Sequence, residues 1–550
     1  MKRSLLNSLC TGMALVALAT SSCKTTSKNE LEDLSSSYSK NTKAKTSALS
    51  CTAQAEQTDY NLYKLTSDAL RIGDVMPYYD SSTSQFHVFF LKDIWDDATN
   101  KRHPWYGYKT NNFYSYTALS AGEILSCNTN GCAQDYAIGT GSVIKKGSVF
   151  YAFYTGHNPN YPSSCVTHKE GVMLATSSSL NSNFTKSTTF SNMYAPTGLG
   201  YDQTDNFRDP YVFYDATAAK YYMLVAARKD VGGGNWKGVI AYYTSSNLTS
   251  WTYQGVLYDG GTDNFFMMET PEIFKNGSTY YLLFSDINSK NVYYRKSSAI
   301  TGPWSKPVGA DRFDGNGIYG AKTAIDAVGD RYLFGWTNQL TGNTDAGSPT
   351  WGGNLIVHKI FPKANGDLAV AIPHTLKAFM ETQTQAIVKN SQWGNVTNTI
   401  PGTQSYNVIS SADFDVANVI FEPINLDRYK ISATVSYSSS SKDFGFMIGA
   451  CDGFNDFYSL RFIPSQNRFA LEKVNRSGIT STTAVTDVPF TLTPNTSYNI
   501  QIVIENSMLV VYLNNEVALT TRIYKATNTN WGIFSDNSNA TFNNIIVNKP

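Results

Sequence analysis

The chain has 550 residues, of which 44 are basic and 43 acidic, and its formal net charge is +1. This balance excludes an electrostatic argument for nucleic acid as a partner, and the length allows two to four domains of ordinary size. Charged residues make up only 16% of the chain, whereas Tyr (36) and Phe (29) are plentiful, a composition that favours strands and predicts a large all-β extracellular protein.

Residues 1–23 have the layout of an export signal. Two basic residues follow the first Met, residues 13–19 form a short apolar run, and small residues precede Cys23. The end of this segment resembles the lipobox of bacterial lipoproteins, in which the Cys becomes lipidated; an ordinary signal peptide with cleavage nearby is the alternative. We therefore expect a secreted protein, or a cell-surface or outer-membrane lipoprotein of a bacterium attached to the membrane through Cys23. Residues 24–59, rich in Ser, Thr and Lys, would form a flexible tether.

The remaining cysteines give no clear framework. They are Cys51, Cys127, Cys132, Cys165 and Cys451. No Cys-x-x-Cys pair indicates a zinc site, and the odd, scattered set does not predict a disulfide-rich fold. Cys127 and Cys132 bracket a turn sequence, which is compatible with a local disulfide in an oxidising compartment or with two free thiols.

An internal repeat organises residues 60–380. Five segments share a small or acidic start, a short apolar run, a polar turn and an aromatic-rich run, and each predicts a β-hairpin. They begin at Gly73, Gly139, Phe207, Met268 and Tyr319. Their spacing of roughly 50–70 residues is typical of propellers or arrays, and alternating strands between them would complete four-stranded blades. We therefore predict a five-bladed β-propeller catalytic domain over residues 60–380.

The pattern changes after about residue 385. Short alternating strands with turn signals between them follow each other to the end of the chain, which predicts a β-sandwich domain over residues 385–550. This domain has no carboxylate motif of its own. It is expected to be structural or to serve as an accessory sugar-binding module.

Three blades place a carboxylate near the start of their first strand. These are Asp74, Asp209 and Glu269. The innermost strands of a propeller line its centre, so we predict that the three residues occupy equivalent positions and converge, with residues 140–142 and 319–321 at the same place in the other blades. Asp and Glu before Pro are also common in turns, but three in register across a repeat favour a catalytic site.

Converging carboxylates suit the cleavage of glycosidic bonds. One acts as nucleophile or base and another as proton donor, while a third can stabilise the oxocarbenium-like transition state. The sequence therefore predicts a glycoside hydrolase with a carbohydrate substrate, no cofactor and no metal.

The same residues carry a resemblance to a known family. Residues 206–210 (Asn-Phe-Arg-Asp-Pro) are similar to the Arg-Asp-Pro motif of glycoside hydrolase family 32, the invertases, inulinases and levanases. Glu269-Thr270-Pro271 resembles the Glu-Cys-Pro motif of that family. Residues 73–77 stand where the family has its Asn-Asp-Pro-Asn-Gly nucleophile motif, with Gly73 for Asn and Val75 for Pro. The resemblance covers about residues 73–373 and includes Trp-Gly-Gly-Asn-Leu at 351–355.

The resemblance implies a retaining hydrolase that cleaves β-fructofuranosidic bonds in levan, inulin or sucrose-type sugars, on a propeller followed by a β-sandwich. It implies that Asp74 is the nucleophile, Glu269 the acid/base and Asp209 the transition-state stabiliser. Arg208 would contact fructose hydroxyls, and beside it Asp209 is expected to stay ionised.

Three further residues are candidates for substrate binding. Trp105 and Trp336 are expected to line the funnel, where sugar rings stack on aromatic faces; packing in the core is the alternative for each. Ser142 stands in the second blade at the level of the carboxylates.

Other functions remain open from the sequence alone. A family 43-like arabinan or xylan hydrolase would also be a five-bladed propeller with three carboxylates, but Arg208 before Asp209 favours family 32. A non-catalytic fructan-binding lipoprotein is disfavoured because all three carboxylates are present. A fructosyltransferase would use the same three groups, so the sequence does not separate transfer from hydrolysis.

Overall fold

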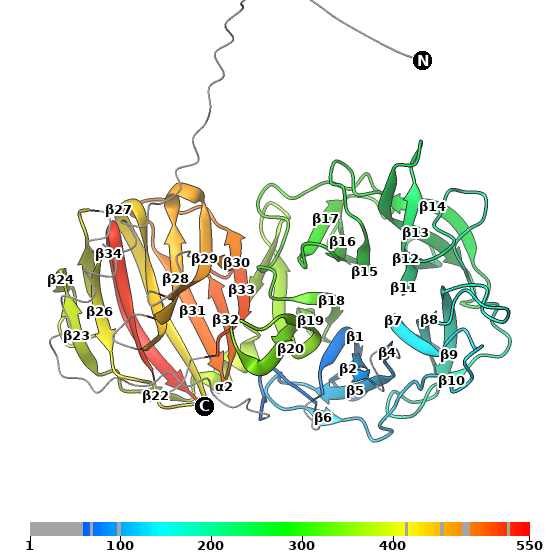
Figure 1. The fold of residues 1–550 in the computed structure, drawn as a ribbon, viewed down its shortest axis with the longest axis horizontal. Helices are drawn as coiled ribbons and strands as arrows, with labels where there is room; N and C mark the ends of the chain where they lie inside the picture. The colour runs from blue at the N-terminus through cyan, green and yellow to red at the C-terminus, as the bar shows by residue number, and fades with distance from the viewer. Residues whose placement is uncertain are drawn as a thin grey trace, which may run out of the picture.

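The computed structural model describes residues 59–66, 70–95, 101–412, 416–451, 456–475, 484–524 and 529–550. The predicted signal sequence, Cys23 and nearly all of the predicted tether lie outside these residues. Within them, no helix is long and apolar enough to cross a bilayer. Figure 1 shows two all-β parts side by side, a ring of antiparallel blades around a common centre and a sandwich; one pairing, of Ile72 with Gly353, joins the strands of the first and last blades into one sheet. The predicted fold, a five-bladed β-propeller followed by a β-sandwich, is confirmed.

The five blades are antiparallel sheets whose first strand lies nearest the centre (Figure 1). Blade I contains β1 (Ile72–Asp80), β2 (Gln85–Lys92), β5 (Trp105–Thr110) and β6 (Thr117–Ala118), with a small hairpin of β3 (Ile94–Trp95) and β4 (Lys101–Arg102) beside it. Blade II contains β7 (Ala137–Lys146), β8 (Val149–His157), β9 (Glu170–Ser177) and β10 (Thr185–Lys186). Blade III contains β11 (Phe207–Asp215), β12 (Lys220–Asp230), β13 (Trp236–Ser245) and β14 (Thr252–Tyr258). Blade IV contains β15 (Met268–Asn276), β16 (Thr279–Asp286) and β17 (Val292–Ser297), and blade V contains β18 (Tyr319–Ile325), β19 (Arg331–Leu340), β20 (Pro349–Pro362) and β21 (Leu368–Ala371).

The blades bury both of their faces, which explains the nearly continuous apolar runs of their second strands. Successive side chains of a strand point to opposite faces. In β2, Phe89 packs into a cluster with Ile138 of blade II, whereas Val88 packs with Phe334 of blade V. The five first strands begin at or within one or two residues of the five predicted repeat starts.

The second part consists of one short helix and a set of antiparallel strands. The helix α2 (His374–Met380) and β22 (Gln383–Gln385) follow blade V. The other strands are β23 (Lys389–Trp393), β24 (Asn395–Asn398), β25 (Tyr406–Ile409), β26 (Ala417–Phe421), β27 (Arg428–Cys451), β28 (Asp456–Ile463), β29 (Arg468–Asn475), β30 (Ala484–Pro489), β31 (Tyr498–Glu505), β32 (Met508–Leu513), β33 (Val517–Arg522) and β34 (Asn530–Lys549). A 3₁₀ turn, η3 (Pro464–Gln466), lies between β28 and β29, and another, η1 (Thr341–Asn343), lies between β19 and β20 of blade V.

Two long strands connect the sheets of the sandwich. The first part of β27 pairs with β31 and its last part with β28, while β34 pairs with β27 along most of its length. Register shifts interrupt this long pairing, for example between Tyr437 and Ser439. Such bulges bend a strand and let it pass from one sheet to the next.

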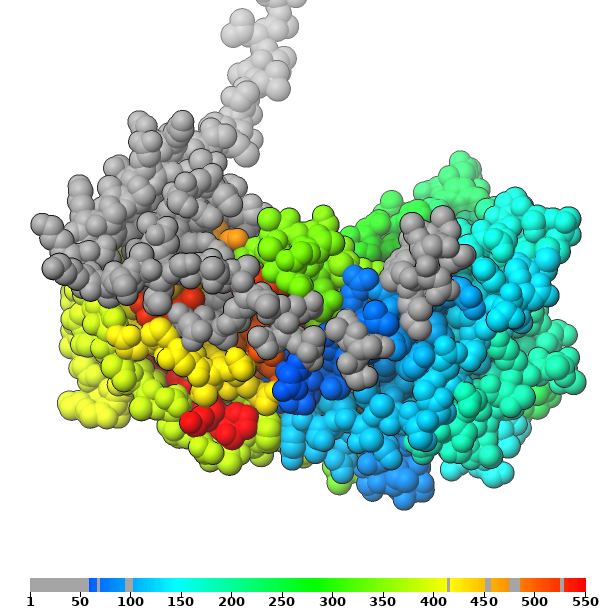
Figure 2. Space-filling model, turned by 60° about the horizontal axis from the view of Figure 1, so that its bottom comes forward, coloured from blue at the N-terminus to red at the C-terminus, as the bar shows by residue number. Residues whose placement is uncertain are grey.

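One hydrophobic cluster joins the propeller to the sandwich. It includes Ile318 and Ile356 of blade V, Leu376 of α2, and Met508 and Val510 of β32, all nearly or fully buried. The two parts therefore share a core and are not linked modules. Figure 2 shows the first described residues, in dark blue, at the seam between them.

Buried polar contacts cross the same seam. The carboxylate of Glu505, on β31, accepts the backbone N–H groups of Asn61, Leu62 and Tyr63, each at 2.9 Å, and the Nε of Arg428 at 2.7 Å. The segment that contains these residues also bonds to β20, where Leu355 N–H donates to the carbonyl of Lys64 and Asn354 to that of Tyr63. The start of the described chain is thus fixed to the sandwich and to blade V.

A second buried network crosses the seam at Asp314. His358 Nε2 lies 3.1 Å from the Oδ2 of Asp314, and His358 Nδ1 lies 3.0 Å from the hydroxyl of Tyr512. The backbone N–H and hydroxyl of Thr520, on β33, donate to the Asp314 carboxylate. Each buried polar group of this network has a partner, as a packed seam requires.

The disulfide does not lie where either sequence alternative put it. Cys132 is bonded to Cys165, with 5.4 Å between their Cα atoms, and Cys127 is unpaired. The local disulfide is wrong and the free-thiol alternative holds for Cys127 only, because the loop containing Cys165 comes close to Cys132 from 33 residues further along the chain.

A charge placed in the shared core should destabilise the whole chain. We expect Val510→Asp to lower the free energy of unfolding by on the order of 3–5 kcal/mol, because an unpaired buried charge is strongly disfavoured. Val485→Asp is the matched control in the same domain, since Val485 is exposed. Thermal unfolding followed by calorimetry tests this. Two separate transitions in Val510→Asp, with that of the propeller unchanged, would contradict the shared core.

Candidate active site

A β-bulge interrupts the first strand of every blade near its start. In β1, Ile72 pairs with Lys92 and Val75 with Phe90, so that β1 has one residue more than β2 over this stretch. The same shift follows the paired residues Ile138, Arg208, Glu269 and Tyr319 in the other four blades. Bulges re-aim side chains at the rims of sheets.

The bulge shows that the three carboxylates do not occupy equivalent positions. Glu269 is the last paired residue before the bulge of its blade, Asp209 is the first residue inside its bulge and Asp74 the second. The prediction of equivalent positions is therefore wrong by one and two residues. Backbone angles support this alignment, since Asp209, Thr270 and Gly320, each first in its bulge, have φ of 61°, 49° and 55°.

Asp74 is held by hydrogen bonds from two other blades. Thr140 Oγ1 donates to its Oδ2 at 2.6 Å and Trp336 Nε1 donates to its Oδ1 at 2.9 Å. Gly320 makes room for it, because a Cβ at that position would lie 2.2 Å from Oδ1 of Asp74. Burial and then the charge of Glu269 raise the pKa of Asp74, while the two hydrogen bonds act in the opposite direction.

Glu269 is bound to a cation and to a phenol. Arg208 donates to its Oε1 from Nη2 at 2.6 Å and from Nε at 3.1 Å, and the Tyr319 hydroxyl donates to its Oε2. Arg208 also donates from Nη1 to Glu170 at 3.3 Å. Burial alone would raise the pKa of Glu170, but the Arg208 guanidinium holds it well below the usual range. Arg208 is thus a fixed bridge between an ionised carboxylate and Glu269.

Asp209 is the most deeply buried of the three carboxylates, at 3% exposed. Its Oδ2 accepts the N–H of Thr270 at 3.0 Å, and its own N–H donates to Thr155 Oγ1 at 2.8 Å. Burial, followed by the charge of Glu269, raises the pKa of Asp209 to about 7, although Arg208 acts in the opposite direction. The expectation that Asp209 stays ionised beside Arg208 is therefore wrong below neutral pH.

Buried charges also fill the centre beneath this site. Lys322, on β18, reaches across to blade II, where its Nζ donates to the carbonyl of Gly141 at 2.7 Å. Burial lowers the pKa of Lys322 to about 8, although Asp209, Glu272 and Asp74 favour its charge. Glu272, fully buried on β15, accepts the backbone N–H and hydroxyl of Thr323. Side chains therefore close the centre of the propeller below the carboxylates.

Two Trp rings and a His ring line up beside Asp74. Trp336 lies 5.9 Å from Trp351, and Trp351 stacks on His103 at 4.2 Å between ring centroids. The Trp351 ring also covers Gly73, where a Cβ would lie 2.0 Å from its Cη2 atom. This packing explains the Gly that departs from the Asn of the nucleophile motif.

The other predicted substrate-binding residues have different roles. Trp105 is fully buried and donates from Nε1 to the carbonyl of Gly139 at 3.0 Å, so the prediction that it lines the funnel is wrong. Ser142 is also buried, and its hydroxyl bonds to the backbone of Pro210 and Val212, which commits it to joining blades II and III. Trp336 does lie at the site, but it contacts Asp74 and is only 5% exposed.

Tyr319, which the repeats placed at the level of the carboxylates with residues 320 and 321, does lie at the site, where it precedes the bulge of its blade as Arg208 and Glu269 do in theirs. Two other residues of the site were not predicted. Lys322 follows the same bulge, one residue after it. Glu170 starts β9, in a third strand outside the repeat, and no sequence signal marked it.

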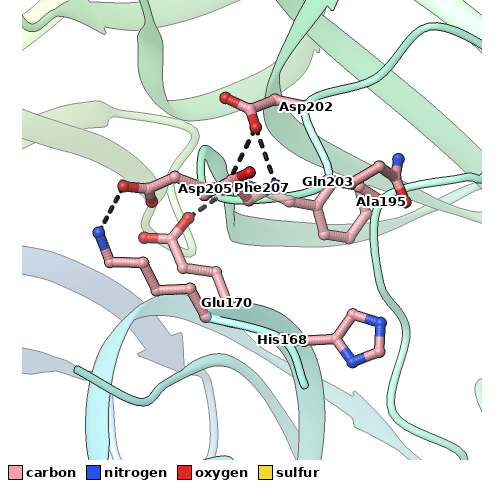
Figure 3. Close-up of a pocket in the computed structure, with 9 residues that line it drawn as sticks. His168, Glu170, Ala195, Asp202, Gln203, Asp205 and Phe207 are labelled. Atoms are coloured by element: carbon pink, nitrogen blue, oxygen red, sulfur yellow. Dashed lines mark hydrogen bonds and ion pairs between the residues drawn. The ribbon is translucent and has the colours of Figure 1, made fainter. Parts of the chain in front are cut away.

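A small pocket opens beside Glu170 (Figure 3). It is lined by His168, Lys169, Glu170, Ala195, Asp202, Gln203, Thr204, Asp205 and Phe207. Asp202 accepts the N–H groups of Thr204 and Asp205, and Lys169 pairs with Asp205 at 2.6 Å. Its acidic groups are thus engaged within the protein. In the described part of the chain, no group of three or more His, Cys, Asp or Glu side chains is arranged to hold a metal ion.

Comparison with family models matches both parts of the chain. Residues 77–366 match "Glycosyl hydrolases family 32 N-terminal domain", and residues 366–547 match "GH32, BT1760-like, C-terminal domain". Asp209 and Glu269 lie inside the first match, and Asp74 lies three residues before it.

Curated proteins with similar sequences match over shorter stretches. Sucrose-6-phosphate hydrolase of Escherichia coli is 29% identical over 175 residues, which are 30% of this chain and 35% of that protein. Raffinose invertase of E. coli is 24% identical over 30% of this chain and 36% of its own length. The matched region thus spans about a third of the length of these two relatives.

Solved structures are similar over nearly the whole chain. Sucrose-6-phosphate hydrolase from Lactobacillus gasseri has a TM-score of 0.63 at 14% identity, covering 96% of this chain and 97% of that one. Fructan 1-exohydrolase IIa from Cichorium intybus has a TM-score of 0.65 at 13% identity, covering 90% and 98%. At these identities the structures establish the shared fold.

The buried Asp209 should make stability depend on pH. Its folded pKa of about 7 lies above the ordinary value of about 3.9, so the stability it contributes is complete below about pH 4 and is lost as the pH rises through 7. Asp209→Asn has no such proton to lose. We expect this variant to gain on the order of 2 kcal/mol relative to the parent chain between pH 5 and pH 8. Melting temperatures measured across this range test it, and a difference that stays constant with pH would contradict it.

Proposed function

We propose, because the chain belongs to glycoside hydrolase family 32, that it is a retaining hydrolase of β-fructofuranosidic bonds in fructans or sucrose-type sugars. One observation carries this proposal: Asp74, Asp209 and Glu269, from three different blades, meet at one end of the propeller. The charge of Glu269 acts on both of the other carboxylates, so the three groups lie close enough to act on one sugar.

The surroundings of Asp74 suit a nucleophile. Thr140 and Trp336 fix both of its oxygens, and no Lys or Arg is paired with it among the described residues. In the first step an oxygen of Asp74 bonds to the anomeric C2 of the fructosyl unit as the bond from C2 to the leaving oxygen breaks. The two donors orient the carboxylate, and the nearby charge of Lys322 acts on Asp74 without a hydrogen bond to it.

The surroundings of Glu269 suit a group that gives and takes a proton. In the first step its proton passes to the leaving oxygen. In the second step Glu269 takes a proton from water, the water oxygen bonds to C2, and Asp74 is released with retention. Arg208 donates two hydrogen bonds to one carboxylate oxygen of Glu269 and Tyr319 donates one to the other, so the carboxylate is held in one orientation for both steps.

Asp209 and Arg208 suit the recognition of the fructosyl hydroxyls. Asp209 is buried beside both catalytic candidates and carries a proton below about pH 7 in the free chain. A group near its pKa can donate or accept a hydrogen bond, and bonds that strengthen in the transition state lower the barrier. Arg208 keeps one edge on Glu170 and would orient Glu269 as well as the substrate.

A substrate panel tests the proposed function. The purified chain should release fructose or fructo-oligosaccharides from at least one of levan, inulin and sucrose, and none from arabinan or xylan. The first product should have the β configuration at C2, read by NMR within the first minutes. Release of the inverted anomer would contradict the role of Asp74, and a dominant yield of longer fructosides would indicate transfer in place of hydrolysis.

The acid/base role of Glu269 has its own test. In Glu269→Gln the proton donor is lost while the amide can still accept a hydrogen bond from Arg208. We expect turnover of a natural fructan to fall by about 10²–10⁴-fold, whereas a fructoside with an activated leaving group, which needs little protonation, should lose far less. Asp74→Asn is the comparison variant and should lose activity on both substrates. Equal losses on both substrates in Glu269→Gln would remove Glu269 from the role of acid.

A further inference from the structure

Two exposed aromatic side chains enclose an arginine at the rim of blades III and IV. Trp236, the first residue of β13, is 41% exposed and Phe266, just before β15, is 40% exposed. The guanidinium carbon of Arg228 lies 3.9 Å from the Phe266 ring centroid and 5.9 Å from that of Trp236. We call these three residues the rim platform.

Strand register places the rim platform at the same end of the propeller as the carboxylates. Arg208 pairs with Ala226, and Arg228 follows two residues later on β12, so Arg208 and Arg228 project from the same face of blade III. Trp236 projects from this face too, because it pairs with Asp230. This face packs against blade IV through Leu224, Ile240 and Met268.

The rim platform also lies close to Glu269 along the chain. Phe266 precedes Glu269 by three residues, which can span at most about 10 Å. Glu269 is itself bound to Arg208 on the same face of blade III. Phe266, at one side of the platform, therefore lies close to Glu269, the residue that we assign to protonating the leaving oxygen.

Arg228 lacks an acceptor within the described chain. Its Nε is buried without a hydrogen-bond partner, and it forms no ion pair with a described carboxylate. A guanidinium carries five N–H donors, and Arg208, by contrast, uses its donors on Glu170 and Glu269. The Nη groups of Arg228 are not buried in this way, so a hydroxyl-rich ligand lying on the two rings would offer them acceptors that the described residues do not provide.

Three successive glycines form the tip of the turn beside the platform. Gly232, Gly233 and Gly234 all have positive φ, and a Cβ on any of them would meet no atom within 4 Å. The carboxylate of Asp230 fixes this turn by accepting the N–H groups of Gly232 and Gly234. A polymer can therefore approach Trp236 over bare backbone.

We propose that the rim platform binds the sugar units on the leaving-group side of a fructan chain, beyond the bond that is cleaved. This inference rests on the proposed function. Aromatic faces accept the C–H side of sugar rings, and the Arg228 guanidinium can donate to hydroxyls at their edge. The leaving group departs next to Glu269, so the units attached to it extend towards Phe266 and Trp236. The platform would thus favour polymers over sucrose, whose leaving group is a single glucose.

Paired kinetics on two substrates tests the rim platform. We expect Trp236→Ala combined with Phe266→Ala to lower kcat/KM on the preferred fructan by about tenfold or more, because both aromatic faces on which the sugar rings lie are removed. On sucrose the same variant should stay within about twofold of the parent chain. Tyr214→Ala is the matched control, since Tyr214 is exposed at the opposite end of the same blade.

The outcomes separate this inference from the proposed function. Equal losses on fructan and sucrose would mean that the changes only disturb Glu269, and unchanged kinetics on both would mean that the rings bind nothing; either result overturns the platform. A parent chain that cleaves no fructoside overturns the proposed function instead. In that case, migration in gels containing levan or inulin decides on the platform: weaker retardation of the double variant than of Tyr214→Ala supports it, and equal retardation overturns it.

Discussion

The first strand of each blade contains one residue more than its neighbour can pair with, and this mismatch decides where the functional side chains point. A regular strand would alternate its side chains between the two adjoining blades. The bulge breaks this alternation near the centre of the propeller. Side chains from three successive positions of a strand can therefore reach the active site. Glu269, Asp209 and Asp74 use these three positions, and Arg208, Thr140 and Tyr319 use the corresponding positions of their strands to hold them.

Acidic side chains outnumber basic ones around the active site. The acidic side chains, all at least largely buried, are Asp74, Asp209, Glu269, Glu170 and Glu272, and the described cations among them are Arg208, Lys322 and Arg331. Arg208 is committed to Glu170 and Glu269. Burial and the negative charges of Glu269 and Asp74 therefore outweigh its effect and raise the pKa of Asp209 to about 7.

The sequence predicted the features that depend on local pattern. Strand periodicity and the five repeats sufficed for the propeller, and the motifs around Asp209 and Glu269 sufficed to find the acidic centre. Features that depend on distant contacts were missed or wrong. Trp105 carries no local sign that it points into the core between blades I and II. The partner of Cys132 depends on a loop 33 residues away, and Glu170 enters the site only because β9 begins beside the start of β11.

The seam between the two parts has a mechanical consequence. Residues 61–63 are hydrogen-bonded on one side to Glu505 of the sandwich and on the other side to Asn354 of β20 in blade V. A force applied to the chain at residue 59 would act on these hydrogen bonds before it acts on β1, which starts at Ile72. The strand that carries Asp74 thus begins after the chain has already been fixed to both parts of the fold.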